Sequence, residues 1–191
     1  MRKNLLIVVS APSGCGKGTI LSEILKDDNY HFSVSATTRQ PRDGEVNGVN
    51  YHFLSREEFE RRVENDEFVE HAEYCGNYYG TLKSETDQQL EKGKDVILEI
   101  EVNGASQMMK LRPDAVFIFI APPSIAELER RLHKRGTEKE DVIKERVAQA
   151  ERELSYAPKY DYIVVNDALE DAVDDFKAII RAEKCRTDKN K

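Results

Sequence analysis

The sequence predicts an α/β protein in which a parallel sheet is flanked by helices. Short, almost continuously apolar runs alternate with longer amphipathic stretches, which is the pattern of parallel strands joined by crossover helices. Strands of such a sheet are buried on both faces, so their sequences lack a polar alternation. With 191 residues, of which 39% are hydrophobic, the chain is long enough to form one domain with a substantial core.

Four apolar runs predict the strands of this sheet, and the segments between them predict its helices. Ser124 and Glu127 have the spacing of a capping box, which predicts a helix start, and Thr137 and Glu140 repeat it. The predicted strands are Leu5–Val9, Asp95–Glu101, Val116–Ile120 and Tyr162–Val165; the predicted helices are Lys17–Lys26, Lys83–Lys92, Gly104–Leu111, Ser124–Lys134, Thr137–Leu154 and Glu170–Lys184.

The pattern changes between about His31 and Thr81. Strand-like pieces surround a long loop there, and one capped helix begins at Ser55, without a strand–helix–strand rhythm. These pieces predict a small α+β insert; its strands are expected at Phe32–Ala36, Tyr51–Leu54 and Phe68–Tyr74. The insert is expected to span residues 33–83, and residues 186–191 are expected to form a flexible tail.

Composition excludes several classes of protein. With 29 Lys and Arg against 36 Asp and Glu, the net charge of −7 argues against a nucleic-acid binder. The longest apolar runs, Leu5–Val9 and Ala115–Pro123, are far shorter than the ~20 residues that a membrane span needs. The three cysteines form no Cys-x-x-Cys pair, and the four histidines lack metal-ligand spacing. We therefore expect no direct protein metal site, no disulfide framework and a cytoplasmic location.

A glycine-rich turn between the first strand and the first helix carries the strongest single motif. Residues Ala11–Thr19 read APSGCGKGT. Glycines let backbone N–H groups converge on phosphate oxygens, a helix N-terminus favours anions, and Lys17 adds a positive charge. The strict phosphate-loop pattern is incomplete, since Ala11 replaces a glycine and Gly18 replaces a hydroxyl residue. A plain glycine-rich turn with an incidental lysine therefore stays possible from the motif alone.

The insert carries a second cluster, of arginines and tyrosines. Arg39 and Arg42 lie three residues apart on a loop that contains proline and glycine, and their guanidinium groups suit bidentate capture of a phosphate. Hydroxyls from the tyrosines of the same cluster, Tyr51, Tyr78 and Tyr79, could complete its coordination. Taken alone, an Arg-x-x-Arg pair is more often a solvated basic loop.

Taken together, these segments resemble the guanylate kinase family. The similar stretches follow the order of that family from about Leu5 to Asp167, and two of them, TTRQPRDGE and GNYYG, are highly specific. They are APSGCGKGT, SATTRQPRDGEVNGVNYHF, EFVEHAEYCGNYYGT, DVILEIEVNGA, FIFIAPPS and RLHKRGTE. The resemblance implies one guanylate kinase-like domain of about residues 4–184. Within it, a P-loop NTPase-type core of residues 1–32, 84–124 and 154–185 carries a GMP-binding insert of 33–83 and a helical lid of 125–153.

The implied reaction is ATP + GMP = ADP + GDP, with Mg²⁺ accompanying ATP as phosphoryl donor, in the recycling of GMP and the supply of guanine nucleotides. By resemblance, Arg39, Arg42, Tyr51 and Tyr79 hold the GMP phosphate, and Ser35, Glu70 and Thr81 read the guanine. A carboxylate such as Glu70 can accept hydrogen bonds from both N1–H and the 2-amino group of guanine, a pair that adenine does not offer. No residue is assigned to the ribose 2′-hydroxyl, so dGMP is an expected substrate.

The resemblance also implies the ATP side of the reaction. Lys17, Arg42, Arg135 and Arg146 would stabilise the transferring phosphoryl group, because phosphoryl transfer needs alignment and positive charge. Because Gly18 lacks a hydroxyl, Mg²⁺ is expected to be held by nucleotide phosphates and water, with Glu99 as an outer partner. The expected ATP-binding residues are Ala11, Pro12, Ser13, Gly14, Cys15, Gly16, Lys17, Gly18, Thr19, Arg131 and Asn166, and Glu101 is expected on the GMP side.

Several of these positions have a plainer interpretation. Glu99 could be a solvated carboxylate at a strand end, and Asn166 with Asp167 could cap the following helix. Cys15 at a helix N-terminus beside Lys17 could have a lowered pKa and react with alkylating agents, although we favour an inert thiol. Two further cations, Arg130 and Lys134, are expected to be surface charges.

Two alternatives to this activity remain from the sequence. The first is a catalytically weak guanylate-kinase-like module that binds proteins, which the retained Gly14, Gly16 and Lys17 disfavour. The second is a related kinase of a phosphorylated sugar, for which Ser35 and Glu70 would have no use. The expected partners are ATP and GMP, with no nucleic acid and no membrane, and the chain is expected to be a monomer or a weak homo-oligomer.

Overall fold

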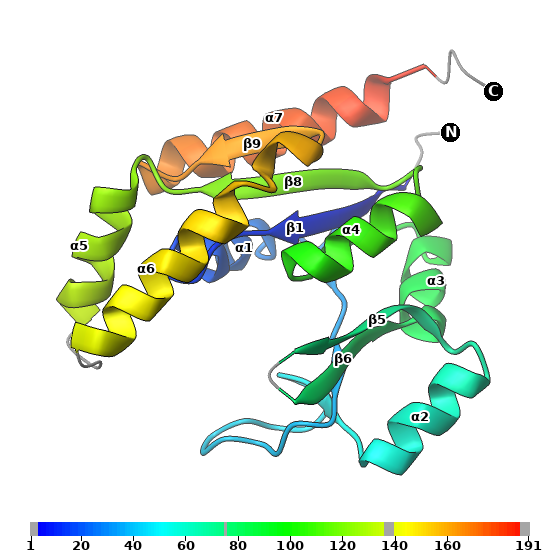
Figure 1. The fold of residues 1–191 in the computed structure, drawn as a ribbon. Helices are drawn as coiled ribbons and strands as arrows, with labels where there is room; N and C mark the ends of the chain where they lie inside the picture. Colours follow the sequence, from blue (N-terminus) through cyan, green and yellow to red (C-terminus); the bar gives the residue numbers. More distant parts are fainter. Residues whose placement is uncertain (1–3, 75, 136–139, 188–191) are drawn as a thin grey trace. The chain divides into compact units, whose positions relative to one another are not determined.

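The computed structural model describes residues 4–74, 76–135 and 140–187. Strands β1 (Leu6–Ser10), β2 (Tyr30–Phe32), β7 (Asp95–Glu99), β8 (Val116–Ala121) and β9 (Tyr162–Val165) form a five-stranded sheet in the order β2-β7-β1-β8-β9 (Figure 1). Pairs β2–β7 and β8–β9 are parallel. Every residue of β1 and β8 is buried, as expected for parallel strands covered on both faces. The predicted α/β class is confirmed.

Helices follow the strands of this sheet, as the sequence predicts. They are α1 (Lys17–Ile24), α4 (Val102–Leu111), α5 (Ile125–Arg135), α6 (Glu140–Leu154) and α7 (Leu169–Cys185), with a short 3₁₀ turn at Ala157–Lys159. The hydroxyl of Ser124 accepts a hydrogen bond from the Glu127 amide at 3.1 Å, which confirms the predicted start of α5. The predicted cap at Thr137 lies outside the described residues.

A second sheet has four strands, β3 (Ala36–Thr37), β4 (His52–Phe53), β5 (Phe68–Tyr74) and β6 (Asn77–Leu82), in the order β4-β3-β6-β5. Two helices belong to the same part of the chain, α2 (Arg56–Glu64) and α3 (Lys83–Glu91). Phe59 of α2 stacks on Phe68 of β5 with ring centroids 4.4 Å apart, and both rings are buried. Strand β6 was not predicted, although most of its residues belong to the GNYYG motif.

The predicted single strand Phe32–Ala36 is wrong, because this segment is divided between the two sheets. Strand β2 pairs in parallel with β7, and the Ser33 amide extends that pairing by donating to the Ile97 carbonyl at 3.0 Å. Strand β3 begins at Ala36, three residues after Ser33, and pairs with β4 and β6 instead. Strand β7 likewise ends at Glu99, and α4 begins at Val102, before the predicted start at Gly104.

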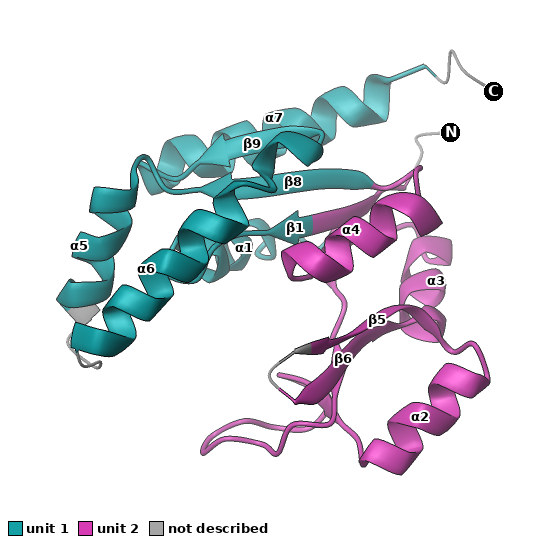
Figure 2. Ribbon diagram, viewed as in Figure 1, with its two compact units in different colours: residues 1–3, 9–28, 116–191 teal, residues 4–8, 29–115 magenta. Residues whose placement is uncertain are grey.

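The chain divides into two compact units (Figure 2). The second unit comprises Asn4–Val8 and Asn29–Ala115, and the other described residues form the first. The expected boundaries of core, insert and lid stay predictions. None of the helices in the described part of the chain has the length and apolar character needed to cross a membrane.

Candidate nucleotide-binding site

The loop between β1 and α1 has the backbone geometry of an anion-binding turn. Gly14 and Gly16 have φ values of 93° and 80°, in the left-handed region that favours glycine. The Cys15 amide donates to the Pro12 carbonyl at 3.2 Å, and the Gly16 carbonyl accepts from the Thr19 and Ile20 amides at 3.0 and 3.2 Å. Helix α1 begins at Lys17, directly after the loop, so its positive dipole end favours a phosphate there.

The glycines of this loop differ in how closely other atoms approach them. A Cβ atom added at Gly16 would lie 2.5 Å from Nδ2 of Asn166, and one added at Gly14 would lie 2.9 Å from Cδ2 of Leu132. At Gly18, by contrast, the only heavy atoms of the described chain within 4 Å of such a Cβ belong to its chain neighbours and to the backbone of its own helix. The first two glycines are therefore required by backbone and packing, whereas Gly18 leaves open space.

Asn166, at the end of β9, holds the loop from the side. Its buried side-chain amide donates to the Cys15 carbonyl at 2.6 Å, and its backbone carbonyl accepts from Nη1 of Arg131 at 3.0 Å. The alternative role as a helix cap is wrong, because α7 begins after Ala168. Asn166 thus connects two predicted parts of the ATP site, the loop and an arginine of α5.

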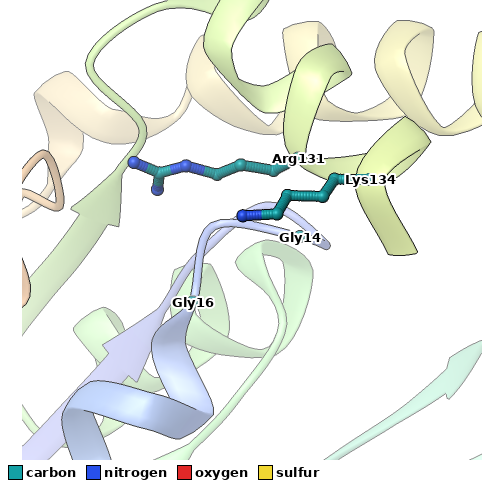
Figure 3. A pocket seen from close by; sticks show the side chains of 4 residues that line it. All are labelled: Gly14, Gly16, Arg131 and Lys134. Atoms are coloured by element: carbon teal, nitrogen blue, oxygen red, sulfur yellow. The ribbon is translucent and has the colours of Figure 1, made fainter.

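Two cations of α5 lie over the loop. Gly14, Gly16, Arg131 and Lys134 line a pocket of about 380 Å³, and Figure 3 shows both long side chains extending across the loop. Residues three apart on a helix share a face, which explains why Arg131 and Lys134 meet the same pocket. Lys134 is exposed, as expected for a surface charge, and its spacing from Arg131 also brings it to this pocket. Arg130 is exposed and pairs with Glu127 at 2.7 Å, as expected for a surface charge.

The remaining predicted catalytic cations are distributed over three helices and a loop. Lys17 is the first residue of α1, and Arg146 lies on α6; both are partly buried. Arg135 ends α5, and its side chain lies outside the described part. Arg42 belongs to the second unit and is exposed.

The Cys15 thiol is buried, and the hypothesis of a reactive cysteine is wrong. It packs with Leu128, Leu132 and Ile143 in an apolar cluster. Burial raises the pKa of this thiol to about 12, against the opposing influence of the Arg131 charge. A protonated, enclosed thiol is a poor nucleophile.

In the second unit, Arg39, Tyr51 and Tyr79 form one cluster. The Arg39 guanidinium carbon lies 5.4 Å from the centre of the Tyr51 ring, and the Tyr51 and Tyr79 ring centroids are 6.0 Å apart. Hydrogen bonds to Glu45 and, less strongly, to Tyr79 raise the pKa of Arg39. This agrees with a site in which one arginine and two tyrosine hydroxyls meet an anion.

The carboxylate of Glu45 lies against this cluster, and the sequence reasoning assigned it no role. Its Oε1 accepts from Nη2 of Arg39 at 2.9 Å, and its Oε2 accepts from the Arg42 amide at 2.7 Å. The Arg39 hydrogen bond, followed by the Arg42 amide, lowers the pKa of Glu45. One carboxylate oxygen thus contacts the Arg39 guanidinium, a group that suits a phosphate oxygen, and the other contacts the backbone amide of Arg42.

The predicted guanine-reading residues lie on adjacent strands of the second sheet. The Thr81 hydroxyl donates to Oε1 of Glu70 at 2.9 Å, and these residues are 1% and 6% exposed. Glu70 and Thr81 are register partners on β5 and β6, and Ala36 of β3 pairs with Gly80 of β6. Continuing that register places Ser35 opposite Thr81, so the three residues follow one line across the sheet.

The Glu70 carboxyl is held in an enclosed, weakly solvated position. Burial raises its pKa to about 7, while the hydrogen bond from Thr81 acts in the opposite direction. Gly104 of α4 leaves room for this carboxyl, since a Cβ there would lie 3.1 Å from Oε2 of Glu70 and 2.6 Å from Cγ2 of Ile100. No signal near Gly104 in the sequence indicated this contact, which joins residues from β5 and α4.

The two acidic residues near the end of β7 have different surroundings. Glu99 is exposed, and its charge is, after burial, the second cause that raises the pKa of Tyr51, so it lies near the tyrosine cluster. Glu101 is exposed at the N-cap of α4, where its carbonyl accepts from the Ala105 amide at 2.8 Å. Over the described ranges, His, Cys, Asp and Glu side chains form no group of three or more suited to hold a metal ion.

Comparison with known proteins agrees with this geometry. The family model described as guanylate kinase matches residues 3–183. The guanylate kinase of Clostridium tetani is 52% identical over 191 residues, covering 100% of this chain and 92% of that protein. That of Desulfitobacterium hafniense is 55% identical over 183 residues, covering 95% and 92%.

A solved structure shows the same fold at lower identity. The crystal structure of guanylate kinase from Anaplasma phagocytophilum matches with a TM-score of 0.80 and 36% identity, over 98% of this chain and 89% of that one. Sequence and structure therefore agree along nearly the whole length of the chain. The phosphate loop, the arginine–tyrosine cluster and the buried Glu70–Thr81 pair occur in a chain that belongs to the guanylate kinase family.

Proposed function

We propose residue roles for the reaction of this family, the ATP-dependent phosphorylation of GMP to GDP. The observation that carries the assignment is the buried carboxyl of Glu70 with its Thr81 hydrogen bond at 2.9 Å. A buried acceptor left without a partner is costly, so this site favours a base that donates from both N1–H and a 2-amino group. Guanine is the purine that offers both donors.

On the GMP side, the phosphate binds to Arg39, Arg42, Tyr51 and Tyr79, and the Glu45 carboxylate gives way to it. The support is the pair of hydrogen bonds that Glu45 makes with the arginine positions. Ser35, Glu70 and Thr81 bind the guanine, and Glu101 belongs to the surrounding polar groups. The assigned residues contact base and phosphate only, so dGMP is a second substrate.

On the ATP side, residues Ala11–Thr19 bind the phosphates through backbone N–H groups, and Lys17 supplies charge. Arg131 and Lys134 add charge from α5, and Asn166 positions the loop through its 2.6 Å bond to Cys15. We assign Arg135 and Arg146 to the transferring phosphoryl group on family resemblance alone.

We expect a Mg²⁺ ion to arrive with ATP and to be held by its phosphates and by water, since Gly18 offers no hydroxyl. Oxygen ligands from nucleotide phosphates and water suit Mg²⁺, which loses water reluctantly. When bound, the ion neutralises charge on the phosphates. The protein's own contribution is alignment and positive charge, without a covalent intermediate.

The surroundings of the reaction are inferred from its substrates. We place the enzyme in the cytoplasm, where GMP is recycled and guanine nucleotides are supplied, as a monomer or a weak homo-oligomer. A protein-binding module without catalysis is disfavoured, because the phosphate loop retains Lys17 and both left-handed glycines, Gly14 and Gly16.

The test is ADP release from Mg-ATP with GMP, dGMP, AMP, UMP, dTMP or ribose bisphosphate as acceptor, each against a control without acceptor. We expect turnover with GMP and dGMP at about 1–100 per second, as is typical of kinases. Equal turnover with AMP would contradict the role of Glu70. GMP binding without turnover would support the non-catalytic module.

A further inference from the structure

Glu85 makes a set of contacts that the proposed reaction does not use. This residue of α3 accepts a hydrogen bond from the Val34 amide through Oε1 at 3.0 Å. The same Oε1 lies 3.1 Å from Nε2 of His31, and Oε2 lies 3.2 Å from Nε2 of His52. A carboxylate only accepts, so each imidazole Nε2 carries a proton and donates to it. One side chain thus joins β2, the segment after it, and β4.

The residues of this cluster come from distant segments of the chain and from both sheets. Its members lie within the second unit but come from distant parts of the chain, 54, 51 and 33 residues from Glu85. His31 belongs to the five-stranded sheet, and His52 belongs to the four-stranded sheet. The Glu85 side chain is 18% exposed, so its hydrogen bonds are partly shielded from competing water.

The residues that Glu85 contacts are sequence neighbours of proposed GMP-binding residues. Val34 precedes Ser35, and His52 follows Tyr51. The two segments are also joined directly, because the His52 amide donates to the Ser35 carbonyl at 2.9 Å. Holding Val34 and His52 therefore fixes the backbone that presents a guanine-binding hydroxyl and a phosphate-binding hydroxyl.

We propose that Glu85 is a positioning residue for GMP: by binding His31, the Val34 amide and His52 together, it holds Ser35 and Tyr51 at the spacing that the base and phosphate of one nucleotide require. This inference rests on the GMP-binding roles proposed above for Ser35 and Tyr51. Glu85 acts through these neighbours and is not assigned a contact with the nucleotide.

The first test compares two substitutions of Glu85. Glu85→Ala removes all three hydrogen bonds and should raise the KM for GMP, and the Kd for GMP measured without ATP, about tenfold. Glu85→Gln keeps the length of the side chain and a carbonyl oxygen for one donor, so its effect should be smaller, about threefold. For both variants we expect the KM for ATP to stay unchanged and kcat to change less than twofold, about the precision of such comparisons.

A matched control comes from the same helix. Glu91, the last residue of α3, is exposed, and Glu91→Ala should leave both KM values and the Kd for GMP unchanged. Thermal unfolding of each variant without ligand measures any loss of stability separately. If Glu85→Ala does not fold, Glu85→Gln alone decides the question.

The outcomes are distinguishable. A fall in kcat at constant KM and Kd for GMP would mean that Glu85 only stabilises the fold, and the inference would be overturned. Equal rises in the KM for GMP and for ATP would overturn it as well, since a positioning residue acts on one nucleotide. If the unsubstituted protein does not bind GMP, the proposed roles of Ser35 and Tyr51 fail instead.

Discussion

At the scale of single residues, the charge of Glu70 decides how the protein responds to pH. Burial raises the pKa of this carboxyl to about 7, and the role proposed for it in guanine binding needs its ionised form. We expect the Kd for GMP to rise as the pH falls below about 7, approaching about tenfold per unit when this proton alone is coupled to binding. Calorimetric titration across this range would measure the slope.

Glu70→Gln supplies the control for that measurement. The phosphate of GMP also titrates, near ~6, so the contribution of Glu70 is the part of the slope that disappears in this variant. An identical slope in both proteins would contradict the assignment.

The same carboxyl affects folding stability. The folded protein keeps this proton up to about pH 7, whereas the unfolded chain releases it near the ordinary value of 4.5. The folded state binds more protons between these values, so Glu70 lowers the free energy of unfolding as pH rises through that window.

At the scale of elements, the loop before α1 depends on β9 through Asn166. The side chain donates to the Cys15 carbonyl at 2.6 Å. Asn166→Ala should raise the KM for ATP by about tenfold, because a buried carbonyl loses its partner and the loop loses its position. The Kd for GMP should not change, since these residues belong to the first unit. Steady-state kinetics with each substrate varied would test this.

The exposed neighbour Asp167 provides the comparison for this variant. Asp167→Ala should leave the KM for ATP near its original value. A similar rise in both variants would instead indicate a general disturbance at the end of β9.

Gly16, at the end of the loop, and Gly18, in α1, allow a matched comparison of two glycine-to-alanine substitutions. Gly18 lies in the first turn of α1 with open space around it, so Gly18→Ala should raise the free energy of unfolding by about 0.5–1 kcal/mol. Gly16→Ala should lower it by about 1–3 kcal/mol, because φ is 80° and Asn166 is 2.5 Å from the new Cβ. Denaturant unfolding of both variants checks the signs, and equal signs would contradict this geometry.

At the scale of the whole molecule, the residues proposed to bind ATP and those proposed to bind GMP belong mainly to different units. Lys17 and the loop lie in the first, and Arg39 and Glu70 lie in the second. A ligand that binds the folded state raises Tm according to its concentration and affinity. Lys17→Ala should therefore lose most of the Tm increase produced by Mg-ATP and keep that produced by GMP, and Arg39→Ala should do the reverse. Thermal unfolding with each nucleotide separately is the measurement.

Loss of both Tm increases in Lys17→Ala would contradict this separation. The rate of phosphoryl transfer should, in contrast, be close to zero in Lys17→Ala, because transfer requires both nucleotides and the lysine charge.

Much of the fold was predictable because its signals are local. Continuous apolar runs indicate buried parallel strands, and the capping residues Ser55 and Ser124 both accept the predicted amide hydrogen bonds, at 3.1 Å each. The error at Phe32–Ala36 has a nonlocal cause. Whether those residues pair with β7 or with β6 depends on strands that lie far along the chain.

The candidate site divides in the same way. The loop glycines and the arginine–tyrosine motif could be predicted from the sequence, because each lies within short segments whose residue types are recognisable without the fold. That Lys134 also lines the pocket was not predicted, since this depends on which face of α5 meets the loop. Cys15 was ambiguous for the same reason, because a thiol at a helix start is reactive or inert according to what covers it.

Local sequence patterns were therefore sufficient to predict the α/β class, the phosphate loop and the family to which this chain belongs. The division of Phe32–Ala36 between two sheets and the contacts of Glu85 became visible only in the folded structure. The same is true of the raised pKa of Glu70 and of the space that Gly104 leaves for its carboxyl. The physical reason is distance along the chain: burial, close approach and long-range hydrogen bonds exist only once remote segments have packed together.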